Sequence, residues 1–198
     1  MTGPGGDERR MTGKTIADLK VGDHAEYSRR IEQSHISGLV EAVGDYNPIH
    51  SDPAFAAATA FREPIAPGVF TAGLISAVIG TQLPGPGAIY LSQTLKFLRP
   101  VRPGDTVTAR AEVLEVIRER NRIRLATICT NQRGEEVLSG EAWVMPAKTA
   151  VHYEPRPQQT AAALGALAVQ PWAWAAQIMT LWATLGLSML RGASERRV

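Results

Sequence analysis

The stretch with the clearest capacity for chemistry is GDYNPIHSDPAF, residues 44–55 of the 198-residue chain. It places a carboxylate, an amide and an imidazole close together, at Asp45, Asn47 and His50. Carboxylates and imidazoles are common general acids and bases, so two of them held together can take a proton from water and return one. The same residue types also build ordinary turns, because Asp and Asn side chains hydrogen-bond to nearby backbone. From these residues alone, a catalytic loop and a structural turn both stay open.

The flanking segments predict that this loop is a short, stiff connector between two helices. Before it, apolar residues recur at helical spacing, with Ser34 placed as the N-cap and Gly44 available for a left-handed C-terminal turn. After it, Asp52 is placed as the N-cap of a short alanine-rich helix. Within the loop, Pro48 fixes its own φ angle and pushes Asn47 toward an extended conformation. Such a loop can hold side chains in one geometry.

Composition and charge narrow the class of protein. A length of 198 residues with 44% hydrophobic residues fits one domain with a real core. The formal net charge is +2 without a clustered basic face, so nucleic acid is not an expected partner. Cys129 is the single cysteine, which excludes an intramolecular disulfide and a multi-cysteine metal site. We expect no metal and a cytoplasmic location.

The middle of the chain predicts a buried helix surrounded by strands. The segment 69–83 has almost no polar face, which in a soluble protein indicates a helix covered on most sides. One β-rich run precedes it, and turn signals separate those that follow. These runs are DHAEYSRRI before the helix, and AIYLSQTLKFLRPV, DTVTARAEVLEV, RIRLATICTNQ and EEVLSGEAWVM after it. An antiparallel sheet curled around one central helix is an α+β arrangement of the hot-dog type.

With these elements in place, the sequence resembles a known family. The stretch GDYNPIHSDPAFAAATAF is similar to the hydratase-2 motif of MaoC-like (R)-specific enoyl-CoA hydratases. The similarity continues in order through PIAPG, QLPGPGAIYL and FLRPVRPGDTVTA, and it covers about residues 16–146. It is strongest to the short enzymes that supply polyhydroxyalkanoate synthesis. The resemblance implies reversible hydration of trans-2-enoyl-CoA to (R)-3-hydroxyacyl-CoA, with the coenzyme A thioester as substrate, no other cofactor, and a homodimeric assembly.

The resemblance also assigns site residues. Asp45 and His50 match the catalytic pair of the family, and Asn47 lies between them inside the motif as a substrate-binding candidate. Ser76, on the predicted central helix, matches a serine that lies near the active site in the closest relatives. Gly68 matches the glycine whose backbone N–H faces the thioester carbonyl. The residue before it is Pro67 where the family usually has histidine, and we expect the oxyanion site to survive this difference.

Other functions stay open, because a fold does not determine a reaction. A hot-dog acyl-CoA thioesterase and a 3-hydroxyacyl-carrier-protein dehydratase are the alternatives among enzymes. A non-catalytic scaffold that binds hydrophobic or granule surfaces is the alternative of another class. Arg99 and Arg102 are possible partners for the coenzyme A phosphates, although arginines beside a Pro-Gly turn are usually just solvated. We expect surface or capping roles for the histidines outside the motif, and packing for Cys129 in its strand.

Domain organisation is predicted from changes in composition along the chain. The predicted parts are a disordered segment 1–15, the hot-dog domain 16–147, a linker 148–171, an apolar helix 172–190 and a basic tail 191–198. From Pro157 to Leu190 no side chain is charged. The segment 172–190 therefore needs an apolar partner. A membrane, a polyester granule and self-association in oligomers are three open interpretations, and packing on its own domain is a fourth.

Overall fold

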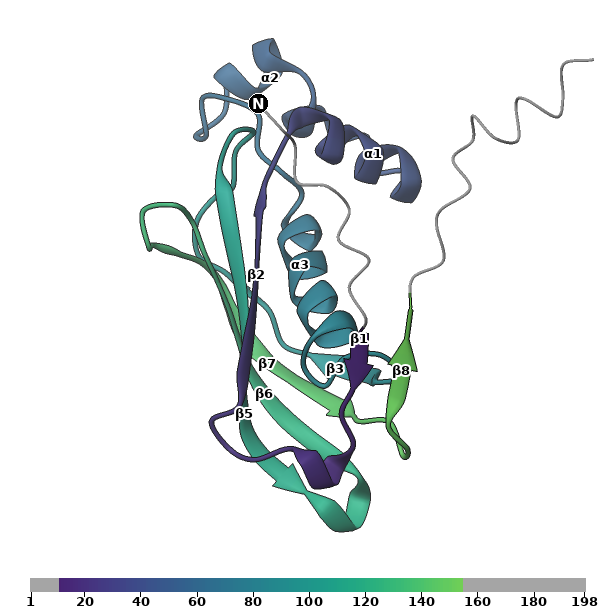
Figure 1. Cartoon of the computed structure of the whole chain (residues 1–198). Coiled ribbons are helices and arrows are strands. Elements are labelled where there is room, and N and C mark those ends of the chain that lie inside the picture. Colours follow the sequence, from purple (N-terminus) through teal and green to yellow (C-terminus); the bar gives the residue numbers. More distant parts are fainter. Residues whose placement is uncertain (1–10, 155–198) are drawn as a thin grey trace, which may run out of the picture. The chain divides into compact units, whose positions relative to one another are not determined.

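The structure, a computed structural model, describes residues 11–154. Its elements are β1 (Met11–Gly13), β2 (His24–Arg30), α1 (Gln33–Val43), α2 (Pro53–Ala57), α3 (Gly68–Thr81), β3 (Ile89–Gln93), β4 (Lys96–Phe97), β5 (Thr106–Ile117), β6 (Arg122–Thr130), β7 (Glu136–Met145) and β8 (Val151–Tyr153). Short 3₁₀ helices cover Ile16–Asp18, Pro48–His50 and Arg118–Arg120. An antiparallel sheet of order β2-β5-β6-β7-β3, with β4 also paired to β7, curls around α3 (Figure 1). The predicted sheet around a central helix is confirmed.

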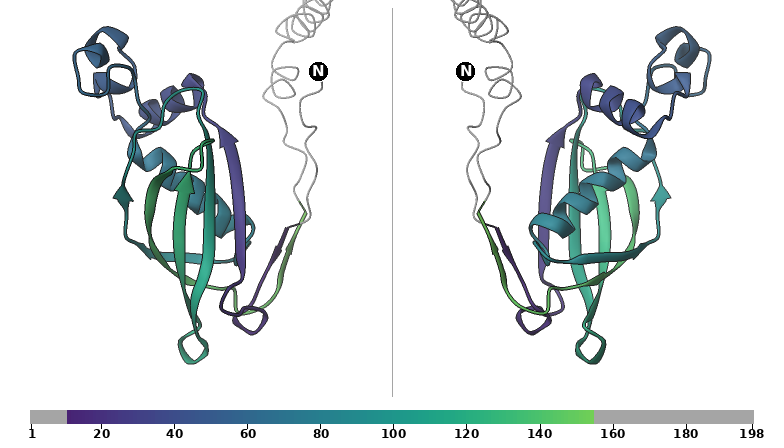
Figure 2. Two further views of the ribbon diagram at one scale, coloured as in Figure 1. Left: turned by 90° about the vertical axis from the view of Figure 1, so that its left-hand side faces the viewer. Right: turned by 90° about the vertical axis from the view of Figure 1, so that its right-hand side faces the viewer.

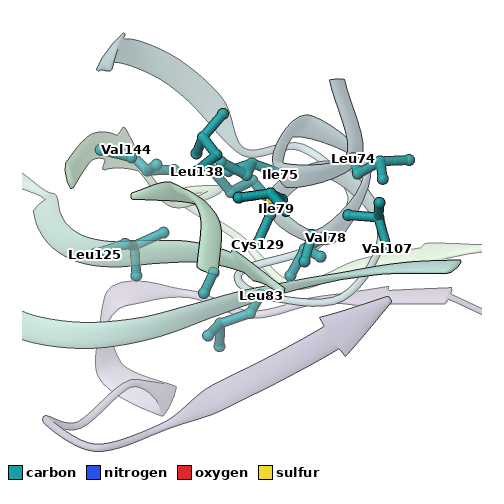
Figure 3. Close-up of a cluster of buried hydrophobic side chains, with 14 of the residues drawn as sticks. Leu74, Ile75, Val78, Ile79, Leu83, Val107, Leu125, Cys129, Leu138 and Val144 are labelled. Atoms are coloured by element: carbon teal, nitrogen blue, oxygen red, sulfur yellow. The ribbon is translucent and has the colours of Figure 1, made fainter. Parts of the chain in front are cut away.

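Helix α3 holds the sheet in shape because its apolar side chains fill the concave face. Four of them, Leu74, Ile75, Val78 and Ile79, are at most 6% exposed. The strands pack alternate residues against the helix. Of these, Val107, Leu125, Leu138 and Val144 are fully buried (Figure 3). Burying one such side chain contributes about 1.5–3 kcal/mol. The apolar run 69–83 that predicted a buried helix therefore lies at the centre of the core, mostly within α3.

The helices before α3 gather at the end of the sheet where α3 begins (Figure 2). Gly44 ends α1 with a φ of 74°, and its N–H donates to Val40 O at 2.8 Å, as predicted. Asp52 caps α2, because its carboxylate accepts hydrogen bonds from two backbone N–H groups of the first turn. The predicted start of α1 is wrong. Glu32 is the N-cap in place of Ser34, and its N–H donates to His35 Nδ1 at 3.1 Å.

The structure corrects the predicted limits of the domain at both ends. Residues 11–13 are not disordered, since β1 pairs with β8 with Met11 opposite Tyr153. The N–H of Lys14 also donates to Pro84 O at 2.8 Å. Residues 148–154 belong to the same compact unit, which ends at Glu154. The sequence did not predict β1 and β8, because strands of three residues are too short to show apolar alternation. Only their backbone pairing in the structure identifies them.

Predictions for the chain ends fall outside the described residues. They concern residues 1–10, the rest of the linker from 155 to 171, the apolar helix 172–190 and the basic tail 191–198. Attachment to a membrane or polyester granule, which depends on 172–190, stays a prediction. Within residues 11–154, no helix has the length and apolarity needed to cross a membrane.

A pair of glycine substitutions tests the packing of the sheet. A Cβ at Gly140 would lie 1.8 Å from the backbone O of Thr94. We therefore expect Gly140→Ala to lower the free energy of unfolding by about 3 kcal/mol, the upper end for overpacking, because the obstacle is backbone. Urea unfolding at one fixed protein concentration measures the change.

The matched control is Gly38→Ala inside α1, where a Cβ meets nothing within 4 Å. Alanine is the better helix former, so this variant should gain about 0.5–1 kcal/mol. Equal stability of the two variants would contradict the close approach of Thr94 to β7.

Candidate active site

A cavity of about 430 Å³ opens beside the first turn of α3. Its polar side chains are those of Asp45, His50, Thr71 and Arg99, and its apolar lining includes Phe61, Ile65, Val69, Phe97, Leu98, Val101 and Val137. The cavity thus collects residues from the loop after α1, from the segment before α3, from α3 itself and from β4 and β7. A largely apolar cavity with a few converging polar groups is the usual form of a small-molecule site.

The loop after α1 takes its shape from local backbone and cap interactions. The left-handed turn at Gly44 redirects the chain into residues 45–50. Asn47 Oδ1 then accepts a hydrogen bond from Ile49 N at 3.3 Å and caps the 3₁₀ helix Pro48–His50. Asn47 therefore acts as a turn residue and does not line the cavity. The turn directs the ring of His50, which is 7% exposed, inward.

Asp45 and His50 form a close pair on this loop. His50 Nε2 lies 3.5 Å from Asp45 Oδ2, and the Asp45 side chain keeps 44% of its surface exposed. The other ring nitrogen, Nδ1, lies 2.8 Å from Ile65 O. A carbonyl oxygen can only accept, so Nδ1 carries the proton and Nε2 of the neutral ring presents a lone pair.

This protonation pattern decides what the pair can do. A neutral Nε2 and an ionised carboxylate are both acceptors, so they do not hydrogen-bond to each other. One water placed between Asp45 and His50 can donate an O–H to each of them, which leaves its lone pairs free. The pair is therefore suited to hold a water and to accept its proton.

The first turn of α3 supplies the complementary group, a hydrogen-bond donor. The N–H groups of Gly68 and Val69 stand at the start of the helix, where no intrahelical acceptor exists. The helix dipole adds partial positive charge at the same place. Gly68 is required by packing as well, because a Cβ there would lie 2.8 Å from the ring of Phe97. Pro67 is the N-cap and lacks an N–H, but the Gly68 amide remains at the cavity wall.

The remaining predicted site residues divide between the cavity and other places. Ser76 is exposed on α3, two turns beyond Gly68, and does not line the cavity of this chain. Arg99 does line it, and its Nη1 donates to Glu136 O at 2.7 Å. Arg102 instead pairs with Glu63. Sequence analysis missed Thr71, although its place one helical turn after Gly68 was a usable signal.

The histidines outside the motif and the cysteine do not line the cavity. His24, His35 and His152 each interact with a neighbouring polar group outside the cavity, as predicted. Cys129 is buried, and its thiol donates to Thr71 O at 3.8 Å. Burial raises the pKa of this thiol to about 12. Among residues 11–154, no three His, Cys, Asp or Glu side chains come together as metal ligands.

Comparisons with known proteins agree with this geometry. The model of the MaoC like domain matches residues 21–132. The chain belongs to the MaoC-like family. A 3-hydroxybutyryl-CoA dehydratase of Methylorubrum extorquens is 54% identical over 132 residues, 66% of this chain and 83% of that protein. An (R)-specific enoyl-CoA hydratase of Rhodospirillum rubrum is 46% identical over 132 residues, 66% of this chain and 91% of that protein.

A solved structure confirms the hot-dog fold of this MaoC-like chain. The unliganded R-hydratase of Pseudomonas aeruginosa superimposes with a TM-score of 0.71 at 43% sequence identity. The match covers 75% of this chain and 96% of that one. The α+β class predicted from periodicity and the family predicted from the loop motif are therefore both confirmed.

The His50 tautomer can be measured directly. Because Nδ1 faces the Ile65 carbonyl, we expect the neutral ring to carry its proton on Nδ1. Nitrogen NMR shifts of labelled histidine at mildly alkaline pH distinguish the two tautomers, and His50→Gln assigns the signal. A neutral His50 with its proton on Nε2 would contradict the geometry described for the pair.

Proposed function

We propose that this protein hydrates trans-2-enoyl-CoA to (R)-3-hydroxyacyl-CoA and catalyses the reverse dehydration. The observation that carries the proposal is the Asp45–His50 pair, 3.5 Å apart, on a cavity that also holds the start of α3. The family membership and the reactions named for the relatives support it. The reaction class is that of a hydro-lyase.

Hydration of an enoyl thioester sets three requirements, of which the first two concern the atoms and protons of the attacking water. Its oxygen must bond to C3 while one of its protons leaves, and C2 must receive a proton. Water held between Asp45 and His50 Nε2 meets the first requirement, because both groups accept hydrogen bonds from it and one of them can take its proton. The pair then returns one proton to C2, so that one water is added in total. Each positioned acid or base contributes about 10²–10⁴-fold to the rate.

The third requirement is stabilisation of the charge that develops on the thioester oxygen. As the new C–O bond forms, the electrons of the double bond move toward the carbonyl, which becomes enolate-like. The Gly68 N–H and the positive end of the α3 dipole, at the wall of the same cavity, can supply that stabilisation. Removing one such donor typically costs on the order of 10²–10³ in rate.

The face of the double bond to which water adds follows from the positions of Asp45 and His50. Asp45 and His50 act from one short loop, so water and proton reach the same face of the double bond. The (R) configuration of the product comes from the names of the relatives. The apolar side chains around the pair, such as Phe61 and Val69, suit an acyl chain.

A single substrate separates this function from its alternatives. Crotonyl-CoA loses its conjugated-enoyl absorbance when it is hydrated, and a thiol reagent detects any free coenzyme A. Loss of absorbance without thiol release supports the hydratase, whereas thiol release supports a thioesterase. If neither occurs, the hydratase proposal fails, and a carrier-protein substrate or a non-catalytic scaffold becomes the better explanation.

The pair itself is tested by two conservative substitutions. Asp45→Asn and His50→Gln should each lower kcat for crotonyl-CoA by at least about 10²-fold, because each replaces a positioned base with an amide that cannot take a proton. Circular dichroism should show that both variants keep the fold. The control is Asn47→Ala, which removes a turn cap outside the cavity. It should lower the free energy of unfolding by about 0.5–2 kcal/mol and lower kcat much less than the two pair variants do. Turnover close to wild type in either pair variant would end this mechanism.

We further propose that two copies associate through the β3 edge of the sheet. Strand β3 pairs with β7 on one side only, and edge strands readily recruit another strand. Large apolar side chains are exposed along β3 and the segment after it, namely Ile89, Leu91, Leu95, Phe97 and Leu98. Phe97 and Leu98 also line the cavity, so a second copy at this edge would complete its wall.

A charge introduced on this edge tests the assembly. We expect Leu91→Lys to shift the protein from dimer to monomer in sedimentation, because a lysine would be placed in an apolar interface. Leu114→Lys is the matched control, since Leu114 is similarly exposed, at 37% against 40%, but lies on the interior strand β5. A Leu91→Lys protein that remains dimeric would contradict association through β3.

A further inference from the structure

Thr71 is a buried polar residue that neither the family motif nor the mechanism above uses. It is 3% exposed and lines the same cavity as Asp45 and His50. Within residues 11–154 its hydroxyl makes no hydrogen bond, and its oxygen is not among the atoms sealed from solvent. The hydroxyl therefore opens on the cavity. An unpaired buried hydroxyl costs about 1–3 kcal/mol, so the Thr71 hydroxyl needs a partner, and the cavity is where that partner can bind.

Two other threonines, Thr81 and Thr127, make the hydroxyl hydrogen bonds to the protein that are expected of a structural threonine. Thr81, on the same helix, donates from Oγ1 to Ala77 O four residues back at 2.7 Å. Thr127, also fully buried, accepts from Gln93 Nε2 at 2.8 Å. For Thr71 the carbonyl four residues back is that of Pro67, which accepts the Phe70 N–H at 2.9 Å. Thr71 does not make the local bond that is usual for a helical threonine.

The position of Thr71 on α3 aims it toward the donor end of the helix. Residues three apart share one face, and helical side chains tilt toward the N-terminus. The Thr71 side chain therefore points back toward the turn that begins with Gly68. Gly68 has no side chain to block this path, and the Phe97 ring closes the space beside it. Thr71 and Gly68 thus line the same part of the cavity.

We infer that the Thr71 hydroxyl donates a hydrogen bond to the thioester oxygen of the bound substrate, beside the Gly68 N–H. The inference rests on the proposed hydratase function and adds a second donor to its oxyanion site. The alternative partner, the attacking water, fits less well. A donor on its lone pair would lower its nucleophilicity, and Asp45 and His50 already accept hydrogen bonds from its two O–H groups. Thr71 is in this sense a catalytic residue, since its hydroxyl contacts the oxygen that gains charge.

The test compares Thr71→Val, which keeps the shape and removes the hydroxyl, with Thr71→Ser, which keeps the hydroxyl. With crotonyl-CoA we expect Thr71→Val to lower kcat by about tenfold or more with a smaller change in KM, because the bond strengthens as charge develops. Thr71→Ser should recover most of the rate. Thr81→Val, the same substitution at the far end of the same helix, should keep the wild-type kcat.

A thermal melt without substrate separates catalysis from structure. Because the Thr71 hydroxyl makes no hydrogen bond to the protein, Thr71→Val should melt at or above the wild-type temperature while it loses turnover. A full wild-type kcat in Thr71→Val overturns the inference, as does a lowered melting temperature with equal loss in Thr71→Ser. If the wild-type protein does not hydrate crotonyl-CoA, the proposed function fails first and this inference with it.

Discussion

The burial of α3 against the concave face of the sheet determines the rest of the molecule. Side chains such as Leu74, Ile75 and Val78 are held from several strands at once, so the helix has little freedom to shift or rotate. The amide of Gly68 is fixed by the same packing, since it begins this helix. Apolar contacts about two to three turns away thereby determine where a hydrogen-bond donor stands in the cavity. Precision in a polar site here derives from hydrophobic packing.

The loop that carries Asp45 and His50 is hydrogen-bonded through Ile65 to the segment that leads into α3. Ile65 precedes α3 by a few positions, and its N–H donates to Ile49 O at 3.3 Å while its carbonyl accepts from the His50 ring at 2.8 Å. The next residue, Ala66, donates to Val101 O at 2.8 Å and ties this segment to the chain before β5. The catalytic loop and the helix that carries Gly68 are therefore connected by backbone groups. Changes of side chain along this segment leave those bonds in place.

Local patterns in the sequence predicted what depends on local physics. The apolar run of α3, the alternation in β5 and the ends marked by Gly44 and Asp52 each follow from periodicity or cap chemistry. The pairing of β1 with β8 was missed, because it joins two short segments across almost the whole domain. Asn47 carried a motif signal, yet its side chain caps a 3₁₀ turn, and Ser76 faces outward from α3. Which face of a buried helix meets a cavity depends on the strands around it, and no local pattern encodes that.

The single cysteine of the chain, Cys129, lies directly behind a residue of the proposed active site. Cys129 donates to the carbonyl of Thr71, a residue that lines the cavity proposed to hold a thioester. Cys129 itself is fully buried and does not line that cavity, whereas a thiolate in contact with a thioester could take its acyl group and release coenzyme A. Burial holds the pKa of Cys129 at about 12, so the sulfur remains a protonated, weak nucleophile at neutral pH. The apolar core thus does more than fold the chain, because it also separates the chain's one thiol from the cavity proposed to hold a thioester.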